Sequence, residues 1–556
     1  MMTAWLCLLM TLGFASPNPD DLDRDLVGYW PLSGDFRDHS GNGLDATAEG
    51  TVDRLAPGRD GTPGRAAGFD GQSGGLVVPL DAARELAEGD LTVSAWVFTE
   101  GQVDSPIGDL VSQYNASTRR GLILGIKTNA GVTFSHANDR HLQFGIDDDR
   151  ESDWLPVGVP GGDGTLLAFA LASHDGALYA GTCEPGASDS GRVYRYDGGT
   201  TWTDCGSPDG SNSVTSLAVF EGTLYAGTGR YRVAGSSLPE SPNDTPGGRV
   251  FRYEGGTTWT DCGQLPDVIA VSGLTVFQGT LYAGSLYAPA GFFRYEGGTT
   301  WTALETPEGK RVEAIAPFDG LLYATSYDQG HVFRFDGQDW TDLGPLGDPE
   351  INTQTYSLAV YQGALHVGTW RSGRVYRLGD QGEWIDVGRL GEELEVMGML
   401  PHNGRLMAGS LPLAQVYRYE GGQDWRLLTQ LDTTPEVVYR RAWTMAEHAG
   451  RLFVSTLPSG QVFAYRAGAS TSWDQTFPAG WHHVAAVRSG DSLRLFVDGS
   501  PVASETVDGS GAFDLSAEAP LRIGSGPNAP FRGRLAEVRL HGRALSDDEI
   551  ARLASP

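Results

Sequence analysis

The stretch GRVYRYDGGTTWTDCG at residues 191–206 returns almost unchanged as GRVFRYEGGTTWTDCG at residues 248–263. Fainter copies follow along the chain, and each copy comes after a second phrase of the type LxVFxGxLYAGT. The core of that second phrase begins at Leu178, Leu224, Leu281, Leu322, Leu365, Leu406 and Leu452. These starts lie about 40 to 60 residues apart, roughly the length of one four-stranded blade of a β-propeller. The repeats therefore predict seven blades, with six or eight as alternatives.

A tryptophan motif indicates how the ring of blades closes. Trp202, Trp259, Trp340 and Trp384 each begin a short outer-strand phrase that ends in glycine. The same phrase occupies residues 154–158, before the first complete repeat, whereas the seventh repeat ends without it. We therefore expect the chain around Trp154 to supply the outer strand of the last blade, which is built from residues 438–466.

Short stretches of alternating apolar and polar residues flank the repeats on both sides, as antiparallel strands do. Before the repeats stand LVGYWPLSGDFRDHSGNG, GFDG and LTVSAWVF; after them stand WHHVAAV, LFVDG and RLAEVRL. In this order the phrases resemble the laminin G-like, concanavalin A-like jelly-roll family. Neither flank contains all the strands of such a domain, so the resemblance implies one jelly roll interrupted by one propeller.

The expected architecture is thus all-β, a concanavalin A-like jelly-roll sandwich interrupted by a seven-bladed propeller. We place a signal peptide at residues 1–16, the first part of the jelly roll at 24–150, the propeller at 151–472 and the second part of the jelly roll at 473–556.

Charge and hydropathy narrow the classes of function. The formal net charge is −30, with 70 acidic against 40 basic residues, and such a field repels nucleic acid and anionic membranes. After the N-terminus no stretch of 18 apolar residues occurs, so we predict no membrane span. Residues 1–16 form a short apolar stretch ending in small residues, the pattern of a secretory signal. We therefore expect a secreted protein, extracellular or at the cell surface.

The predicted blades present two different faces. The turns after the first and third strands of each blade are uniform, whereas the loops on the opposite face vary in length, and variable loops on a rigid frame usually carry binding residues. We expect that variable face to carry Arg192, Arg230, Tyr231, Arg249, Tyr287, Tyr327, Trp370, Arg371, Arg374, Arg441 and Trp443. Aromatic planes beside arginine forks suit stacking on sugar rings and the binding of carboxylate or sulfate. The alternative is that these arginines only anchor blade edges.

The jelly-roll resemblance also implies a calcium ion, with Asp38, Asn42 and Glu537 as oxygen ligands. The alternative is that Asp38 and Asn42 only shape the SGNG turn, where such side chains cap backbone N–H groups.

Three functions remain open at this point. The first is non-enzymatic recognition of a glycan or an extracellular protein. The second is a glycoside-active enzyme, such as a sialidase-like glycosidase or a lyase, with its site in the propeller mouth. Asp197–Trp202 resembles the Asp-box turn of sialidases, but that turn is a folding element, and no local motif assembles the three arginines that a sialidase site needs. The third is a structural scaffold in a cell-surface assembly.

Overall fold

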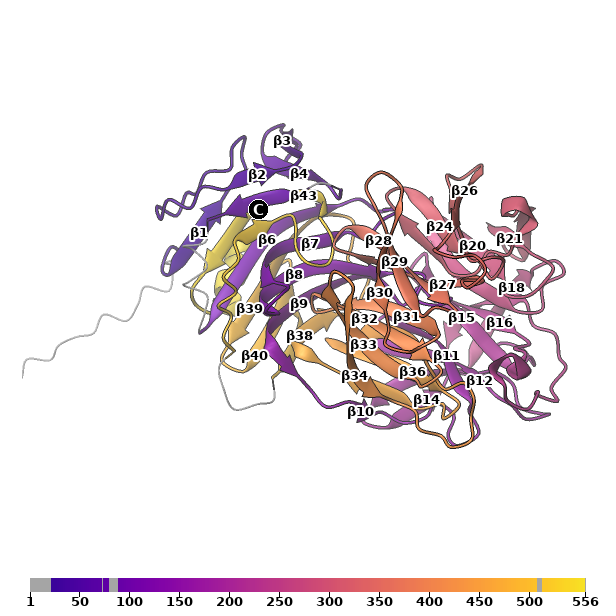
Figure 1. Ribbon diagram of the computed structural model, residues 1–556. Coiled ribbons are helices and arrows are strands. Elements are labelled where there is room, and N and C mark those ends of the chain that lie inside the picture. The colour runs from indigo at the N-terminus through magenta and orange to yellow at the C-terminus, as the bar shows by residue number, and fades with distance from the viewer. Residues whose placement is uncertain (1–21, 73, 80–88, 508–512, 556) are drawn as a thin grey trace, which may run out of the picture.

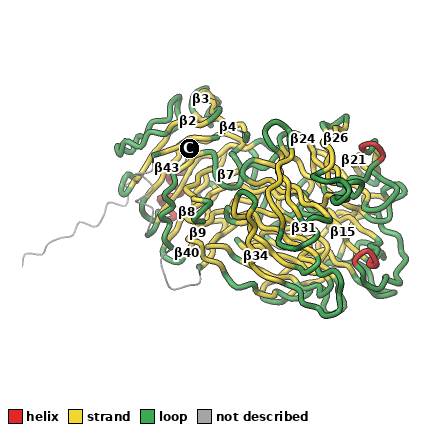
Figure 2. The backbone as a smooth tube through the Cα atoms, viewed as in Figure 1, coloured by secondary structure: helices red, strands yellow, loops and turns green. Residues whose placement is uncertain are grey.

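The computed structural model describes residues 22–72, 74–79, 89–507 and 513–555, so the predicted signal segment at 1–16 lies outside the described residues. Both ends of the described chain, indigo and yellow in Figure 1, form one body, and the middle of the chain forms a second body beside it. Strands predominate in both (Figure 2). The described helices are α1 (Asp547–Leu553), capped by Ser546, and the 3-10 turns η2 (Val233–Ser236) and η3 (Pro307–Gly309).

The first body is a two-sheet sandwich, and each sheet mixes strands from before and after the propeller. The outer sheet runs β3 (Val52–Ala56), β4 (Ala66–Asp70), β43 (Arg532–His541), β6 (Leu91–Thr99), β39 (Gly480–Ser489), β40 (Ser492–Val497) and β41 (Ser500–Thr506), with β1 (Leu26–Trp30) paired to β43. The inner sheet runs β38 (Ala467–Trp473), β9 (Asn138–Glu151), β8 (Arg120–Asn129), β7 (Gly108–Asn115), β42 (Leu521–Ile523), β5 (Gly75–Val78) and β2 (Thr47–Glu49). Neither half of the chain could close this sandwich alone.

Alternation along β9 gives the inner sheet two different faces. Leu142, Phe144 and Ile146 point into the core between the sheets, which also contains Trp30 from the first strand. The intervening residues point the other way, toward the propeller, and Asp147 is one of them. The central part of β9 is therefore buried on both faces of the sheet.

The second body consists of seven four-stranded sheets. From inner to outer strand, the first blade consists of β11 (Leu167–His174), β12 (Ala177–Cys183), β13 (Val193–Gly198) and β14 (Thr201–Asp204). The second consists of β15 (Ser213–Phe220), β16 (Thr223–Gly229), β17 (Arg249–Gly255) and β18 (Thr258–Gln264). The third consists of β19 (Val271–Phe277), β20 (Thr280–Ser285), β21 (Phe292–Gly297) and β22 (Thr300–Leu304). The fourth blade consists of β23 (Ile315–Phe318), β24 (Leu321–Thr325), β25 (His331–Phe335) and β26 (Trp340–Pro345). The fifth consists of β27 (Gln354–Tyr361), β28 (Ala364–Trp370), β29 (Arg374–Leu378) and β30 (Trp384–Arg389). The sixth consists of β31 (Glu395–His402), β32 (Arg405–Leu411), β33 (Gln415–Gly421) and β34 (Asp424–Gln430).

The seventh blade is closed by a strand from the start of the ring. It consists of β35 (Arg441–His448), β36 (Arg451–Leu457), β37 (Val462–Tyr465) and β10 (Leu155–Pro156). Next to β10, Trp154 stacks on Tyr465 with ring centroids 4.4 Å apart. The closure expected from the Trp154 motif is therefore confirmed. It also brings the two junctions with the jelly roll together, because Glu151 of β9 pairs with Ala467 of β38.

The repeated tryptophans join neighbouring blades. The Trp259 indole donates a 2.8 Å hydrogen bond to the Cys205 carbonyl in the preceding blade, and Trp301 does the same to Cys262. Trp202 donates to Val157, which follows the closing strand β10. Each of these hydrogen bonds satisfies an indole N–H that is largely removed from water, which explains why the motif recurs in each blade.

The uniform turns between the first two strands of each blade face the jelly roll. In these two-residue turns both positions have positive φ, as Gln278 and Gly279 illustrate, which accounts for the repeated glycine. The Gln278 N–H donates to Asp104, and the Gly450 N–H donates to Ser472, both in jelly-roll segments. The jelly roll therefore covers this face and leaves the variable-loop face free.

Buried ion pairs hold the two bodies together. Arg405 of the propeller binds the jelly roll's Asp147 through two guanidinium nitrogens, at 2.6 and 2.9 Å from Oδ2. Lys127 of the jelly roll donates to Glu447 of the propeller at 2.9 Å. All four side chains are buried, so each charge depends on its partner.

A loop of the jelly roll also enters the centre of the ring. This finger loop, residues 130–137, connects β8 to β9 and lies against the inner strands of several blades. Its backbone is hydrogen-bonded to Leu358, Leu274, Leu217 and Ser173, and its Thr133 hydroxyl to Thr444. The finger loop thus fills the propeller axis from the jelly-roll side.

Candidate functional site

A cavity of about 370 Å³ opens at the propeller mouth, on the variable-loop face. We call it the mouth pocket. Its walls come from loops between blades and from the first residues of the inner strands. Aromatic side chains dominate the walls: Tyr231, Tyr287, Tyr327, Tyr356, Trp370 and Tyr439.

The tip of the finger loop lies at the base of this pocket. Phe134 is 1% exposed, and its ring lies 5.9 Å from Phe169 and 5.7 Å from Tyr356. Trp443 packs beside them, with its ring 4.8 Å from that of Phe169. A jelly-roll residue therefore forms part of the lining of a pocket in the propeller.

Three neighbouring blades place polar side chains at equivalent positions in the pocket. Gln354, Glu395 and Arg441 are the first residues of the inner strands β27, β31 and β35, and all three line the cavity. In the first and third blades the same strand begins with Leu167 and Val271. The polar side of the pocket is thus built by the last three blades.

Glu395 is a buried carboxyl group without a direct partner. Its side chain is in no hydrogen bond or ion pair among the described residues, although the residue is only 4% exposed. Burial raises the pKa of Glu395 to about 7, and the charge of Arg441 opposes this shift without cancelling it. Near neutral pH the group can therefore gain or lose a proton.

Arg441 supplies the opposite charge. It is 8% exposed, its Nη1 donates to the Ser236 hydroxyl, and its buried Nε has no hydrogen-bond partner among the described residues. The guanidinium lies over the rings of Tyr439 and Trp443, at 5.8 and 5.3 Å from their centroids. No ion pair joins it to Glu395, so the pocket contains two separated charges of opposite sign whenever Glu395 is ionised.

Two further charged residues line the rim. Both carboxylate oxygens of Glu240 accept backbone N–H groups of η2, from Val233 and Ala234, so Glu240 fixes a loop. Arg232 lies over the Tyr287 ring at 4.7 Å and is exposed. The buried charges of the pocket are therefore those of Glu395 and Arg441.

The structure brings together six of the eleven residues expected on the variable face. Tyr231, Tyr287, Tyr327, Trp370, Arg441 and Trp443 line the mouth pocket. Arg230 and Arg371 do not line it, and Arg371 lies over the Trp370 ring. Arg192, Arg249 and Arg374 also lie outside the lining, where they pair with Asp204, Asp261 and Asp386 of the neighbouring outer strands. These three pairs agree with the blade-edge alternative.

Sequence reasoning missed Phe134, Tyr356 and Glu395. Phe134 belongs to a jelly-roll loop, and no local pattern places it in the propeller. Glu395 carries a signal in retrospect, because it is a charged residue at the start of an otherwise apolar inner strand, EVMGML.

The three residues expected to bind calcium have other partners. The Asp38 carboxylate accepts backbone N–H groups from Tyr29, Ser40 and Leu44, and these bonds lower its pKa although partial burial opposes them. The Asn42 amide donates to two backbone carbonyls, and Glu537 forms ion pairs with Arg59 and Arg539. Within the described ranges no group of three or more His, Cys, Asp or Glu residues suits a metal ion. These contacts fit a turn better than a metal site, and the calcium ion stays a prediction.

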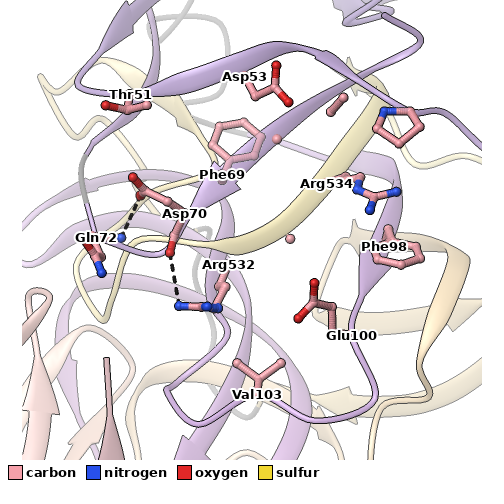
Figure 3. A pocket seen from close by; sticks show the side chains of 14 residues that line it. Thr51, Asp53, Phe69, Asp70, Gln72, Phe98, Glu100, Val103, Arg532 and Arg534 are labelled. Atoms are coloured by element: carbon pink, nitrogen blue, oxygen red, sulfur yellow. Dashed lines mark hydrogen bonds between the residues drawn. The ribbon is translucent and has the colours of Figure 1, made fainter. Parts of the chain in front are cut away.

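A second cleft, of about 470 Å³, lies on the outer sheet of the jelly roll (Figure 3). The Arg534 guanidinium lies 4.3 Å from the centroid of the Phe98 ring, and Asp53, Asp70, Glu100 and Arg532 also line the cleft. Asp53 and Asp70 are exposed, so water solvates their charges. The cleft therefore gives weaker support for a dedicated site than the mouth pocket does.

The strand order and the sequence comparisons define the class of protein. The profile of the concanavalin A-like lectin/glucanases superfamily matches residues 425–551, which begin within β34 of the sixth blade and extend through the second jelly-roll part. The chain contains a laminin G-like, concanavalin A-like jelly roll and an inserted β-propeller. No helix in the part of the chain that the structure describes is long and apolar enough to cross a membrane.

Solved structures similar to this chain contain β-propellers with different activities. A streptogramin B lyase is 13% identical, with a TM-score of 0.44 over 57% of this chain and 97% of its own. A GH74 xyloglucanase from Xanthomonas campestris is 16% identical, with a TM-score of 0.40 over 61% and 59%. The WD40 propeller domain of Doa1 is 13% identical, with a TM-score of 0.40 over 56% and 97%. No curated protein sequence matches the chain. These likenesses are too weak to say anything about activity.

Proposed function

We propose that this chain is a secreted, non-enzymatic recognition protein that binds the terminal residue of an extracellular glycan in the mouth pocket. The observation that supports this most directly is the mouth pocket itself, whose aromatic walls surround two buried side chains of opposite charge. Aromatic rings stack on the apolar faces of sugars, and buried polar groups fix their orientation. A volume of about 370 Å³ lies in the usual range for small-ligand sites.

The lining favours binding over glycoside hydrolysis. Glycosidases of the usual kind need two carboxyl groups that face the substrate. Among the described residues that line the mouth pocket, the carboxyl groups are Glu395 and Glu240, and Glu240 already caps η2. A sialidase-like site would need three convergent arginines, whereas the lining holds Arg232 and Arg441.

Export rests on the apolar segment at residues 1–16, which lies outside the described residues. Calcium binding by the jelly roll remains a separate proposal. Neither is needed for the mouth pocket to bind a ligand.

A glycan array with the exported chain tests the proposal, comparing the wild type with Trp370→Ala and with the control Arg249→Gln. Arg249 lies at a blade edge outside the pocket lining. We expect binding that survives EDTA, persists in the control and is lost in Trp370→Ala. Binding that Trp370→Ala leaves intact but Arg534→Ala abolishes would place the ligand in the jelly-roll cleft and refute the proposal. An array without any binding would exclude a glycan.

A further inference from the structure

We infer that the glycan residue in the mouth pocket is zwitterionic, a sugar that carries both an ammonium group and a carboxylate. This inference rests on the proposed function and specifies its ligand. It follows from a comparison of Glu395 and Arg441 with the buried ion pairs between the jelly roll and the propeller.

The buried charges that link the jelly roll to the propeller are neutralised by direct contact. Arg405 binds Asp147 through two nitrogens, and Lys127 donates to Glu447, at the interface between jelly roll and propeller. The reason is energetic, because an unpaired charge away from water costs far more than a paired one. Glu395 and Arg441 are as deeply buried as residues of these pairs, yet no ion pair joins them.

The backbone keeps the two charges apart. Glu395 begins β31 and Arg441 begins β35, so they stand on the inner strands of neighbouring blades. Arg441 is held back by its bond to Ser236 and by the rings of Tyr439 and Trp443. Because both residues line the same cavity, a bound ligand can contact each of them from the space between.

A ligand with both charges satisfies both residues at once. Its carboxylate would accept charge-assisted hydrogen bonds from Arg441, and its ammonium would donate to Glu395. Tyr327 and Tyr356, whose stacked rings have centroids 5.5 Å apart, line the same pocket. A neutral sugar would leave Arg441 and the ionised form of Glu395 without a counter-charge, and a purely acidic sugar would leave Glu395 unpaired.

The aromatic lining of the pocket favours a sugar ring over a peptide end. Phe134 and Trp443 lie at its base, and aromatic rings surround the volume of about 370 Å³. The rings of Trp370 and Tyr439, whose planes are inclined at 86° to each other, belong to this lining and suit stacking on the apolar face of a sugar.

Four sugars that share the glucose ring and differ in which charged groups they carry provide the test by calorimetric titration. Muramic acid carries both groups, N-acetylmuramic acid only the acid, glucosamine only the amine, and glucose neither. We expect muramic acid to bind most tightly, with the loss of either charge weakening binding about tenfold to a hundredfold. In Glu395→Gln the affinities for muramic acid and N-acetylmuramic acid should become similar. In Arg441→Gln the affinities for muramic acid and glucosamine should become similar.

The matched control is Glu313→Gln. Glu313 is also a buried carboxyl without hydrogen-bond partners, but it does not line the pocket, so its substitution should leave the order of the four affinities unchanged. Equal wild-type affinities for muramic acid and N-acetylmuramic acid would overturn the inference, as would a preference that persists in Glu395→Gln. Failure of muramic acid to bind would overturn it as well. The dipeptide alanyl-alanine carries the same two charges without a sugar ring. If it binds more tightly than muramic acid, the pocket binds a peptide end and the inference of a sugar is wrong.

The two proposals fail separately. If sugars bind without any charge preference and Trp370→Ala abolishes their binding, recognition in the pocket stands and the zwitterion is wrong. If sugars bind and Trp370→Ala has no effect, both are wrong.

Discussion

Truncation of Phe134 to alanine tests whether the finger loop supports both the fold and the pocket. The ring is 1% exposed and packs against Phe169 and Tyr356 at the propeller axis. Truncating a buried phenylalanine costs about 3–5 kcal/mol, through lost burial and the cavity that remains. Because Phe134 also lines the mouth pocket, the truncation should deepen the pocket as well.

Two measurements separate these effects. Denaturant unfolding gives the loss of stability, and calorimetric titration with the best-bound sugar gives the change in affinity. We expect Phe134→Ala to lose about 3–5 kcal/mol and to bind the sugar more weakly, and Phe134→Leu, which keeps most of the volume, to lose clearly less of both. A loss below about 1 kcal/mol would show that the finger loop is not packed as the structure has it. Unchanged affinity in a destabilised variant would show that the pocket does not depend on its base.

Further predictions concern pH, the domain interface and the blade contacts. Burial raises the pKa of Glu395 from 4.5 to about 7, so between these pH values the folded state retains a proton that the unfolded state releases. Stability then falls as pH rises through this window, by an amount on the order of 3 kcal/mol, and pH-dependent denaturation of Glu395→Gln should lack this fall. Arg405→Ala leaves Asp147 buried without its ion-pair partner and should lower the free energy of unfolding by about 3–5 kcal/mol. The double variant Arg405→Met with Asp147→Leu should recover most of that stability in thermal unfolding. A double variant as unstable as Arg405→Ala would contradict this account of the ion pair. Trp259→Phe removes the hydrogen bond to Cys205 and should cost about 1 kcal/mol; a neutral result in denaturation would show that the indole N–H adds nothing to blade contact.

Much of the architecture follows from the sequence because its determinants are local and repeated. The two-residue turns need positive φ at both positions, so their glycines recur, and the indole of Trp259 needs a carbonyl in the neighbouring blade, so its motif recurs. The closing strand β10 was also predictable, because the sequence at Trp154 carries the outer-strand motif before the first complete repeat.

The site was only partly predictable because two of its determinants are not local. Phe134 reaches the pocket from a loop of the other domain, and the partner of each arginine depends on the fold. The variable face was expected to hold aromatic and arginine residues, and Tyr327, Trp370 and Arg441 do line the pocket. An arginine at a blade edge and an arginine in the pocket look alike in sequence, and only their ion pairs distinguish them. Arg249 pairs with Asp261, whereas Arg441 pairs with no carboxylate among the described residues.

The split of the jelly roll explains why its finger loop reaches the propeller at all. Glu151 and Ala467 pair across the junction, so the ring is anchored beside the strands that flank the finger loop. The Lys127–Glu447 and Arg405–Asp147 pairs then fix the ring on the inner sheet, and the finger loop enters its axis as far as Phe134. An insertion joined by two adjacent strands and buried ion pairs cannot rotate freely on its host. Because Phe134 at the base of the mouth pocket belongs to the jelly roll and the walls belong to the propeller, the two domains form a single binding unit, and neither expressed alone would contain the complete pocket.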